Sequence, residues 1–539
     1  MSATADMDGV ALSKRFGPIY IWLVTLTVMS GGIAMGLASS MVNVAVPSVS
    51  GAFGVGLDQA QWMATGFLAT MSASMLVSSW LIEVLGQRTT FMAILTVFGI
   101  GSILCATAPN MDMLIVGRIL QGAANGVGQP LAMYTMFSVF PPNRRGMAIG
   151  IQGLVSVLAP TFGPVVGGIA IDSISWRYLF FLPLPFCVPA MMMGMVFMPT
   201  KKLAKHLPAF DWIGLILVLL VVFTAFNAIS NGPRAGWDAD TVVYPLCASL
   251  AGLVVFILWE LRAPYPLLDL SLFRNPQFAL TMLAGFVFGA GLFASGYFIP
   301  IFVQTIQDYS ATRAGLLLAT GGVVMMIFFP LSGRISDAVP AHIPISAGLL
   351  IFGIGFFMIR VVDVNTTFWA MAAYAALTRV GLSLTVPSLS IAALRAVPED
   401  KLARAASTAT FFRNFGGGLG ITLLTAFFLQ RAKYHSDAFT DTQTWSNSTT
   451  IGLLNEVQKL LASTGLPESV QKAGALNYLS EMVLAQASTL AFKDTFLAIA
   501  IVAFLAVGPA WMIGRTGKKR APTLKVKPGS GAGRPDNRP

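Results

Sequence analysis

The feature of this sequence that most restricts its fold is a series of fourteen long apolar runs. A membrane-spanning helix needs about 20 apolar residues, and an open strand in lipid could not satisfy its backbone hydrogen bonds. The sequence therefore predicts an all-α polytopic membrane protein with fourteen transmembrane helices. The predicted spans are 19–46, 61–82, 90–107, 113–139, 146–171, 178–198, 212–229, 241–260, 278–304, 312–332, 343–360, 367–393, 407–430 and 490–514.

The composition excludes other protein classes. Only 11% of the 539 residues are charged and 55% are apolar, whereas a soluble domain has about 25% charged residues. The runs are unbroken, which excludes a β-barrel built from alternating segments of about ten residues. No phosphate loop, catalytic triad or metal-ligand spacing occurs, and Cys105, Cys187 and Cys247 all lie in apolar runs. We therefore expect no enzymatic activity, no cofactor and no metal site.

The basic residues predict the orientation of the chain. An even number of spans places both termini on one side, and Lys and Arg concentrate on the cytoplasmic side. With both termini in the cytoplasm, 22 of the 34 basic residues lie in inner segments, 9 in outer segments and three within spans. We predict a cytoplasmic N-terminus over 1–18 and a basic cytoplasmic tail over 515–539. The tail explains much of the net charge of +11 and is typical of a segment near anionic lipid, not of nucleic-acid binding.

Two halves of the sequence repeat one pattern. Asn43-Val-Ala-Val-Pro47 ends the first span, and Pro300-Ile-Phe-Val-Gln304 ends the ninth. Arg118 in the fourth span is matched by Arg379 in the twelfth. Matched halves in one orientation are typical of a rocking-bundle transporter and are not needed by a channel. We predict a 6 + 2 + 6 arrangement, with a first six-helix bundle at 19–198, two inserted helices and their loops at 199–277, and a second six-helix bundle at 278–514.

The longest segment outside the predicted spans is 432–489, on the outer face. Its leucines and valines fall on helical stripes on either side of Gly465 and Pro467, which break helices. We therefore predict an extracytoplasmic helical hairpin. It either packs on its own transporter as a lid or provides a docking surface for a partner outside the membrane.

Polar side chains inside the spans are candidates for a substrate or coupling site. A charge in lipid costs about 2.5–3.5 kcal/mol and usually faces a cavity or a partner. In the fourth span, four polar residues recur at intervals of three and four and form one helical face. Arg118 either lines a cavity there or ties down neighbouring backbone carbonyls. The candidates are Asn43, Arg118, Gln121, Asn125 and Gln129 in the first half, and Arg379, Arg413 and Asn414 in the second.

The fifth span is dense in proline and glycine. Proline removes a helix hydrogen bond and glycine removes side-chain bulk, so this helix can bend and a neighbour can approach closely. We predict that it forms a moving contact between the halves. Its candidate residues are Pro160, Gly163, Pro164, Gly167 and Gly168.

Charged turns follow the second and tenth spans on the cytoplasmic side. Acids and bases placed where helix ends meet can form ion pairs that hold one conformation closed. The alternative is that these turns are simply solvated loops. The predicted cytoplasmic gate consists of Glu83, Gly86 and Arg88 in the first half, and Gly333, Arg334 and Asp337 in the second.

These motifs, in this order, resemble the fourteen-span drug:proton antiporter branch of the major facilitator superfamily, the EmrB/QacA-like proteins. The similarity runs from about residue 35 to residue 515 and includes Arg118-Ile-Leu-Gln-Gly122, Gly163-Pro-Val-Val-Gly-Gly168 and Trp176-Arg-Tyr-Leu-Phe180. The resemblance implies a proton-driven exporter of amphipathic compounds in the bacterial inner membrane. For members with an outer hairpin, it implies a periplasmic adaptor and an outer-membrane channel as partners.

The sequence departs from this family where proton coupling is concerned. Members often carry an acid in the first span, five positions before the matching Asn43, where this chain has Ala38. The predicted spans hold no carboxylate away from their ends, so the remaining candidates for a proton site are Asp494, near the outer end of the last span, and Glu83. Three buried arginines without a buried acid favour an amphipathic anion as substrate.

Two other functions stay open at this stage. One is a facilitator or exporter of an endogenous lipid-like metabolite without classical proton coupling. The other is a membrane scaffold or sensor that does not transport. The expected partners of the transporter are small amphipathic substrates, protons and membrane lipids, besides the adaptor and channel that the resemblance implies.

Overall fold

The computed structural model describes residues 15–141, 145–200, 209–398, 401–444 and 446–517 of the chain. Within these residues every regular element is a helix, and there is no strand. In this part of the chain, eleven helical stretches are long and apolar enough to cross a membrane, by length and composition. Each of the fourteen predicted spans is mostly helical, with the sixth divided between Tyr178–Phe181 and Leu184–Phe197, and the all-α membrane fold is confirmed.

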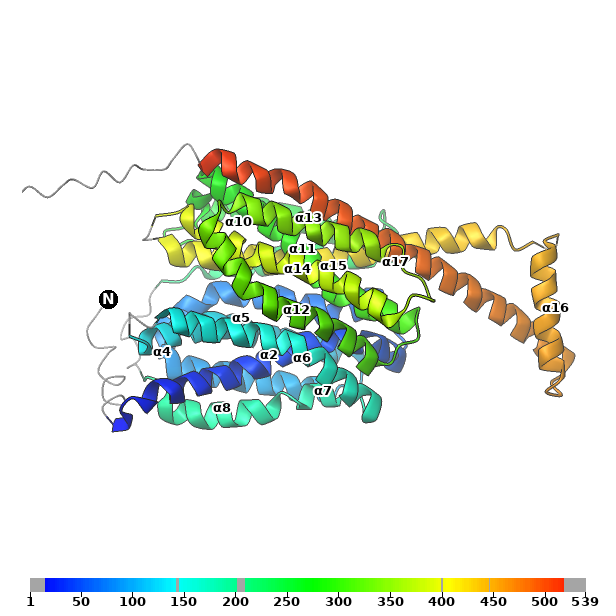
Figure 1. Ribbon diagram of the computed structural model, residues 1–539, viewed down its shortest axis with the longest axis horizontal. Coiled ribbons are helices and arrows are strands. Elements are labelled where there is room, and N and C mark those ends of the chain that lie inside the picture. The colour runs from blue at the N-terminus through cyan, green and yellow to red at the C-terminus, as the bar shows by residue number, and fades with distance from the viewer. Residues whose placement is uncertain (1–14, 142–144, 201–208, 399–400, 445, 518–539) are drawn as a thin grey trace, which may run out of the picture.

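The first half begins with α2 near the N-terminus, and successive membrane crossings alternate in direction (Figure 1). Several are longer than the predicted apolar runs. They are α2 (Ile19–Phe53), the short α3 (Leu57–Ala60), α4 (Trp62–Ala106), α5 (Met111–Val139), α6 (Arg145–Ser173), the short α7 (Tyr178–Phe181) and α8 (Leu184–Phe197).

The inserted pair and the second half follow. The inserted helices are α9 (Trp212–Ala235) and α10 (Asp240–Glu260). The second half consists of a 3-10 turn η2 (Leu270–Arg274), α11 (Pro276–Thr305), α12 (Ala311–Ala338), α13 (His342–Ile359), α14 (Phe368–Arg395), α15 (Leu402–Thr440), α16 (Ser448–Ala462) and α17 (Glu468–Gly517).

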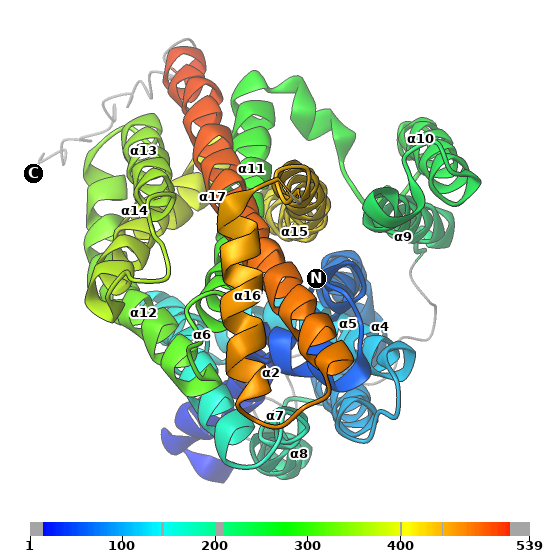
Figure 2. The same cartoon turned by 90° about the vertical axis from the view of Figure 1, so that its right-hand side faces the viewer.

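Viewed along the bundle, the two halves lie side by side and the inserted pair stands at one flank (Figure 2). α9 packs on α10 and also contacts α4 and α15, so the insertion bridges both halves. The domain boundaries at 198/199 and 277/278 stay a prediction.

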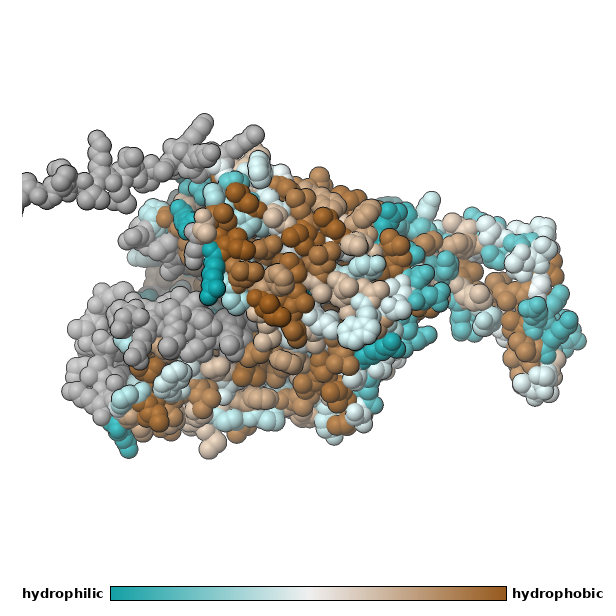
Figure 3. All heavy atoms as spheres, viewed as in Figure 1, coloured by the Kyte–Doolittle hydropathy of each residue, from teal (hydrophilic) through white to brown (hydrophobic). Residues whose placement is uncertain are grey.

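The surface of the bundle carries a broad apolar band (Figure 3). Large side chains such as Trp22, Val188, Leu250 and Leu505 are more than half exposed. Such a surface is costly in water and suits contact with lipid chains. The exposed apolar band and the long helices together show a multi-pass membrane protein.

The ends of the bundle differ. We name the end that carries α16 the hairpin end, and the end where α2 begins and α17 stops the tail end (Figure 1). At the hairpin end, one apolar cluster includes residues of both halves, such as Met41 and Phe67 with Phe298 and Phe302. At the tail end, α2, α4, α5 and α8 form a cluster that contains no residue of the second half. A third cluster joins Leu76 of the first half to Phe411 of the second half through the inserted helices, so the tail-end cluster is a part of the core that stays within the first half.

The described residues of the hairpin segment, 432–489, form helices that are interrupted twice: between Thr440 and Ser448, and at the predicted break around Gly465, whose φ is 77°. Its arms are continuous with the membrane helices, because α15 runs on to Thr440 and α17 begins at Glu468. α16 packs against α17. Figure 1 shows the segment projecting beyond the bundle and not lying across it, and its contact with a partner stays a prediction.

The second and third predicted spans form one helix, α4, that turns at a single residue. Gly86 has φ 77° and ψ 169°, a conformation that is essentially restricted to glycine. The Thr90 hydroxyl donates a hydrogen bond to the Leu81 carbonyl across this turn, at 3.1 Å. Gly86 was predicted as part of a gate, and here it has a backbone role that its sequence position did not reveal.

Replacing Gly86 with alanine is expected to destabilise the protein by about 1–3 kcal/mol, because a Cβ strains this backbone conformation. Thermal unfolding of the purified protein in detergent measures the loss. The matched control is Gly333→Ala, a glycine of the second half that belongs to the same predicted gate. Gly333 lies inside α12 with no atom within 4 Å of an added Cβ, so this change should be neutral or slightly stabilising. Equal stability of the two variants would contradict the proposal that a Cβ at position 86 strains the backbone.

Candidate functional site

Arg118 is almost fully buried, with 1% of its surface exposed. Its Nε donates to the Met63 carbonyl on α4 at 2.8 Å, and its Nη1 donates to the Ala38 carbonyl on α2 at 3.1 Å. Nη1 also donates to Oε1 of Gln121 at 2.7 Å, and the guanidinium lies 4.2 Å from the centre of the Phe67 ring. The guanidinium thus ties α5 to α2 and α4, one of the two roles that the sequence left open.

The rest of the predicted polar face divides into buried and exposed residues. Gln121 donates through Nε2 to the Ser102 hydroxyl at 2.8 Å, and Asn125 donates to the Met35 carbonyl at 3.1 Å. Both side chains are therefore used within the first half. Gln129, one turn closer to the tail end, is exposed. It is the member of this face that is open to a ligand.

The arginines of the second half differ from Arg118. Arg379 on α14 and Arg413 on α15 are both half-buried. Arg379 packs on Gly321, where an added Cβ would lie 2.7 Å from its Cγ. Arg413 lines a cavity of about 100 Å³ between α11, α14 and α15, together with Ser390 and Thr410. Among the described residues, neither guanidinium has a hydrogen-bond or ion-pair partner.

The two candidate asparagines lie where helices of the two halves meet. Nδ2 of Asn43 on α2 is 3.3 Å from where a Cβ of Gly296 on α11 would stand. Nδ2 of Asn414 on α15 lies 3.8 Å from Sδ of Met75 on α4. These amides therefore sit at the contact between the halves.

The glycines of α6 permit close contact with both of its neighbours. A Cβ on Gly163 would overlap the Ser40 hydroxyl of α2, and a Cβ on Gly167 would crowd Leu179 and Met41. A Cβ on Gly168 would overlap the Ala311 carbonyl of α12. The second half contributes a glycine to the same contact, because Gly315 of α12 stands against the Pro164 carbonyl of α6. Pro160, the remaining candidate residue of α6, is exposed.

The predicted cytoplasmic gate lies at the tail end. Arg88 donates to the Thr200 hydroxyl at 3.2 Å, and Glu83 is exposed. Gly333 and Arg334 are part of the continuous helix α12, and the side chain of Asp337 lies outside the described residues. The ion pairs of the gate stay a prediction.

Asp494 on α17 is held by two side chains of α15. Its Oδ2 lies 2.6 Å from Nε of Arg431 and 2.8 Å from Nε2 of His435. The cluster joins the last two membrane helices at the base of the hairpin segment. Both partners favour the charged carboxylate, and the proton site at Asp494 stays a prediction.

The structure has matched halves, an inserted pair of helices and a glycine contact between the halves. In sequence, residues 28–421 match the family model described as Major Facilitator Superfamily. The chain belongs to the major facilitator superfamily. This confirms the resemblance found in the sequence motifs.

Similar members of the superfamily include export and resistance proteins. The chain is 26% identical over 434 residues to the multidrug export protein EmrB of Haemophilus influenzae, covering 80% of this chain and 85% of EmrB. It is 26% identical over 484 residues to the fatty acid resistance protein FarB of Neisseria gonorrhoeae, covering 88% and 92%. These relatives indicate a membrane transporter of the multidrug-efflux type.

The fold is also that of solved transporters. A bacterial homologue of the human lysosomal transporter Spinster, solved in an inward-facing and unoccupied conformation, superposes with a TM-score of 0.61. The match covers 94% of this chain and 100% of the homologue at 14% identity. At this identity the likeness concerns the fold alone.

Sequence patterns did not reveal how this superfamily member attaches its inserted helices. Gln61 donates to the Ser230 hydroxyl of α9 at 2.8 Å, and Ser230 donates to the Asp58 carbonyl at 2.8 Å. Arg234 of α9 lies 3.5 Å from the Asp58 carboxylate. These side chains come from segments about 170 residues apart in sequence, so no periodicity could link them.

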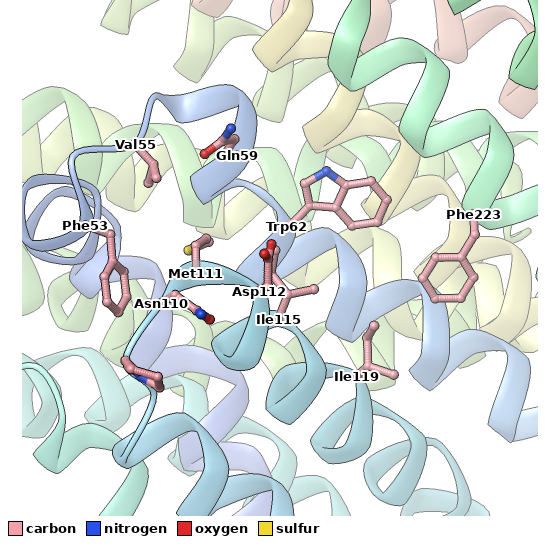
Figure 4. A pocket seen from close by; sticks show the side chains of 11 residues that line it. Phe53, Val55, Gln59, Trp62, Asn110, Met111, Asp112, Ile115, Ile119 and Phe223 are labelled. Carbon is pink, nitrogen blue, oxygen red and sulfur yellow. The ribbon is translucent and has the colours of Figure 1, made fainter. Parts of the chain in front are cut away.

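A groove lies between the first half and α9 at the hairpin end (Figure 4). It has a volume of about 680 Å³, and its walls include Ile115 and Ile119 of α5. Trp62 of α4 stacks on Phe223 of α9 with 6.3 Å between ring centres. Asp112 brings a carboxylate to the groove.

At the tail end, a carboxylate outside the membrane helices joins the inserted segment to α15. Asp269 binds Lys401 at 2.9 Å and lies 3.5 Å from Arg404. Burial raises the pKa of this carboxyl, but hydrogen bonds from Ser271 and Lys401 outweigh burial, so the pKa lies below its usual value. The Asp269 carboxylate therefore stays charged at neutral pH and holds its partners.

Proposed function

We propose that this protein exports amphipathic small molecules across the bacterial cytoplasmic membrane by alternating access, driven by proton influx, with a preference for amphipathic anions. The observation that carries the preference is the pair Arg379 and Arg413. Both cations are half-buried without a described partner, whereas Arg118 is fully engaged within its own half.

The physical argument concerns uncompensated charge. A cation held within the membrane is costly unless an anion or a polar group compensates it. Among the described residues, acidic side chains lie toward the ends of the membrane helices, not at mid-bundle. A carboxylate on an amphipathic substrate would supply the missing charge, and its hydrocarbon part would suit the apolar walls of the bundle. The name of the relative FarB, a fatty acid resistance protein, agrees with this class.

The packing of the halves supports alternating access. They share an apolar cluster at the hairpin end, and at the tail end the first half has a cluster of its own. We propose that the tail end faces the cytoplasm, because 22 of the 34 basic residues then lie inside. The predicted gate at Glu83, Arg88 and Arg334 would close that end in the opposite state.

Proton coupling is proposed at Asp494. The chain has Ala38 where related antiporters often carry an acid, and the Ala38 carbonyl is occupied by Arg118. Asp494 combines a carboxylate with His435 and Arg431 at the hairpin end, the side from which protons would enter. A proton arriving there would weaken a contact between α15 and α17.

The hairpin segment is proposed as the docking surface for a periplasmic adaptor that leads to an outer-membrane channel. It projects beyond the bundle (Figure 1). Several of its apolar side chains are exposed, with 70% of Leu460 on α16 and 51% of Leu476 on α17 open to solvent, although Leu454 is buried. An exposed apolar stripe on a projecting helix is typical of a protein interface.

Purified protein in proteoliposomes tests the function. We expect it to move dodecanoate faster than dodecyltrimethylammonium, and to do so only when a pH gradient is imposed. Dissipating the gradient with a protonophore should reduce the rate to that of protein-free liposomes. Movement without a gradient would instead support a facilitator of lipid-like metabolites. Absence of movement of every amphiphile would support a scaffold or sensor.

A further inference from the structure

At the hairpin end, a side chain of the first half binds the start of a helix of the second half. Asp172, in the last turn of α6, accepts a hydrogen bond from the Ala311 backbone N–H at 3.1 Å through Oδ1. Its Oδ2 accepts one from the Thr312 backbone N–H at 2.8 Å. α12 begins at Ala311, so Asp172 takes two of the backbone donors that a helix leaves unpaired in its first turn.

The carboxylate supplements the ordinary cap of α12. Ser310 precedes the helix, and its hydroxyl accepts from the Arg313 backbone N–H at 3.3 Å. Asp172 and Ser310 together therefore satisfy three backbone donors. The N-terminus of a helix favours a negative charge, which strengthens a bond made by a carboxylate. Among the described residues, Asp172 has no ion pair, so α12 is the partner that the structure shows for it.

The backbones around this contact lie unusually close. Gly168, one turn before Asp172, stands against the Ala311 carbonyl, and Gly315, one turn into α12, stands against the Pro164 carbonyl. A side chain at either glycine would push the helices apart. The glycines thus bring the two helices within reach, and Asp172 fastens them together.

We propose that Asp172 is the latch of the gate at the hairpin end: it holds that end closed, and its release from α12 accompanies opening of the transporter to the outside. The inference rests on the proposed alternating access. Parting the halves at this end requires α6 to leave α12. Both hydrogen bonds of Asp172 then break, and water takes the place of the helix.

A second hydrogen bond joins the halves at the hairpin end and can be compared with those of Asp172. Nε2 of Gln304 on α11 donates to the Val44 carbonyl on α2 at 3.1 Å. It is a neutral hydrogen bond, and Gln304 also donates to the Pro300 carbonyl of its own helix. Because hydrogen bonds to charged groups are about twice as strong as neutral ones, Asp172 should contribute more to closure than Gln304.

Accessibility of two engineered cysteines tests the latch. Cys105, Cys187 and Cys247 are first replaced by alanine or serine. Ala314→Cys reports on the hairpin end, because Ala314 is fully buried one turn beyond Ala311. Ser390→Cys reports on the tail end, where Ser390 is exposed and lines the cavity beside Arg413. The rate of reaction with a water-soluble maleimide is measured for each cysteine in detergent.

In the Asp172→Ala background we expect the cysteine at 314 to react about tenfold faster and the cysteine at 390 to react more slowly. Loss of a cap contact of about 1.4 kcal/mol changes an equilibrium tenfold. Asp172→Asn keeps one acceptor and should give an intermediate rate. Gln304→Ala should have a smaller effect than Asp172→Ala.

The matched control is Asp363→Ala. Asp363 lies at the same end and accepts from the Asn365 backbone N–H at 3.0 Å, but both residues belong to the second half. This variant should leave both labelling rates unchanged. No change in Asp172→Ala would overturn the latch, and so would faster labelling at both positions, since that reports general loosening. Labelling needs no substrate, so a failed export assay and a failed latch are separate results.

Discussion

Replacing Arg118 with alanine is expected to destabilise the protein by at least about 3 kcal/mol, the largest effect of any single change proposed here. Hydrogen bonds from charged groups contribute about 1.5–3 kcal/mol each, and an unpaired buried acceptor costs about 1–3 kcal/mol more. Arg118 makes three such bonds. Its loss would leave the carbonyls of Met63 and Ala38 without this donor and open a cavity beside Phe67. Thermal unfolding in detergent measures the effect.

The control for this prediction is Arg118→Lys. A single ammonium keeps the charge but cannot reproduce the planar fork that reaches α2 and α4 together. We therefore expect a loss of stability between those of the native protein and the alanine variant. An alanine variant that is as stable as the native protein but inactive in export would contradict the structural role and favour cavity lining.

Replacing both Arg379 and Arg413 with glutamine is expected to weaken binding of dodecanoate by about a hundredfold and to leave dodecyltrimethylammonium binding nearly unchanged. Each charge-assisted bond lost corresponds to about 1.5–3 kcal/mol, or at least about tenfold in affinity. Glutamine keeps much of the length and polarity of arginine. Calorimetric titration of the protein in lipid nanodiscs gives both dissociation constants.

Arg360→Gln serves as the matched control, because Arg360 is exposed at the end of α13 and belongs neither to the proposed substrate site nor to the predicted gate. This variant should bind both ligands as the native protein does. Equal weakening for the two ligands in the double variant would indicate lost packing instead of lost charge recognition. Unchanged dodecanoate binding would remove Arg379 and Arg413 from the substrate site.

The apolar pattern was sufficient to predict the membrane helices. Long runs of apolar residues have few solutions in lipid, and each predicted span coincides with helix. The helix lengths were less predictable. α15 and α17 continue past their apolar runs into the hairpin segment, because polar residues with good helix propensity extend a helix after it leaves the lipid.

The residue types of the candidate site could be predicted from the sequence, but the partners that these residues contact could not. The sequence showed that Arg118 needs a partner, but Met63 and Ala38 are 55 and 80 residues away. Local periodicity carries no information on such pairs. The contact of Asp172 could not be predicted for the same reason, because its partner Ala311 lies 139 residues away. Gly86 was recognised as a turn residue, but the φ value that requires glycine appears only in the structure.

The length of α17 has a mechanical consequence. This one helix has 50 residues, or about 75 Å at 1.5 Å per residue, and runs from the hairpin segment to the tail end. The part within the hairpin segment, 468–489, is about 33 Å long by the same rise. As a stiff lever, it would swing its tip by about 6 Å for each 10° of tilt of the membrane part. Rocking of the second half would thus displace a docked partner directly.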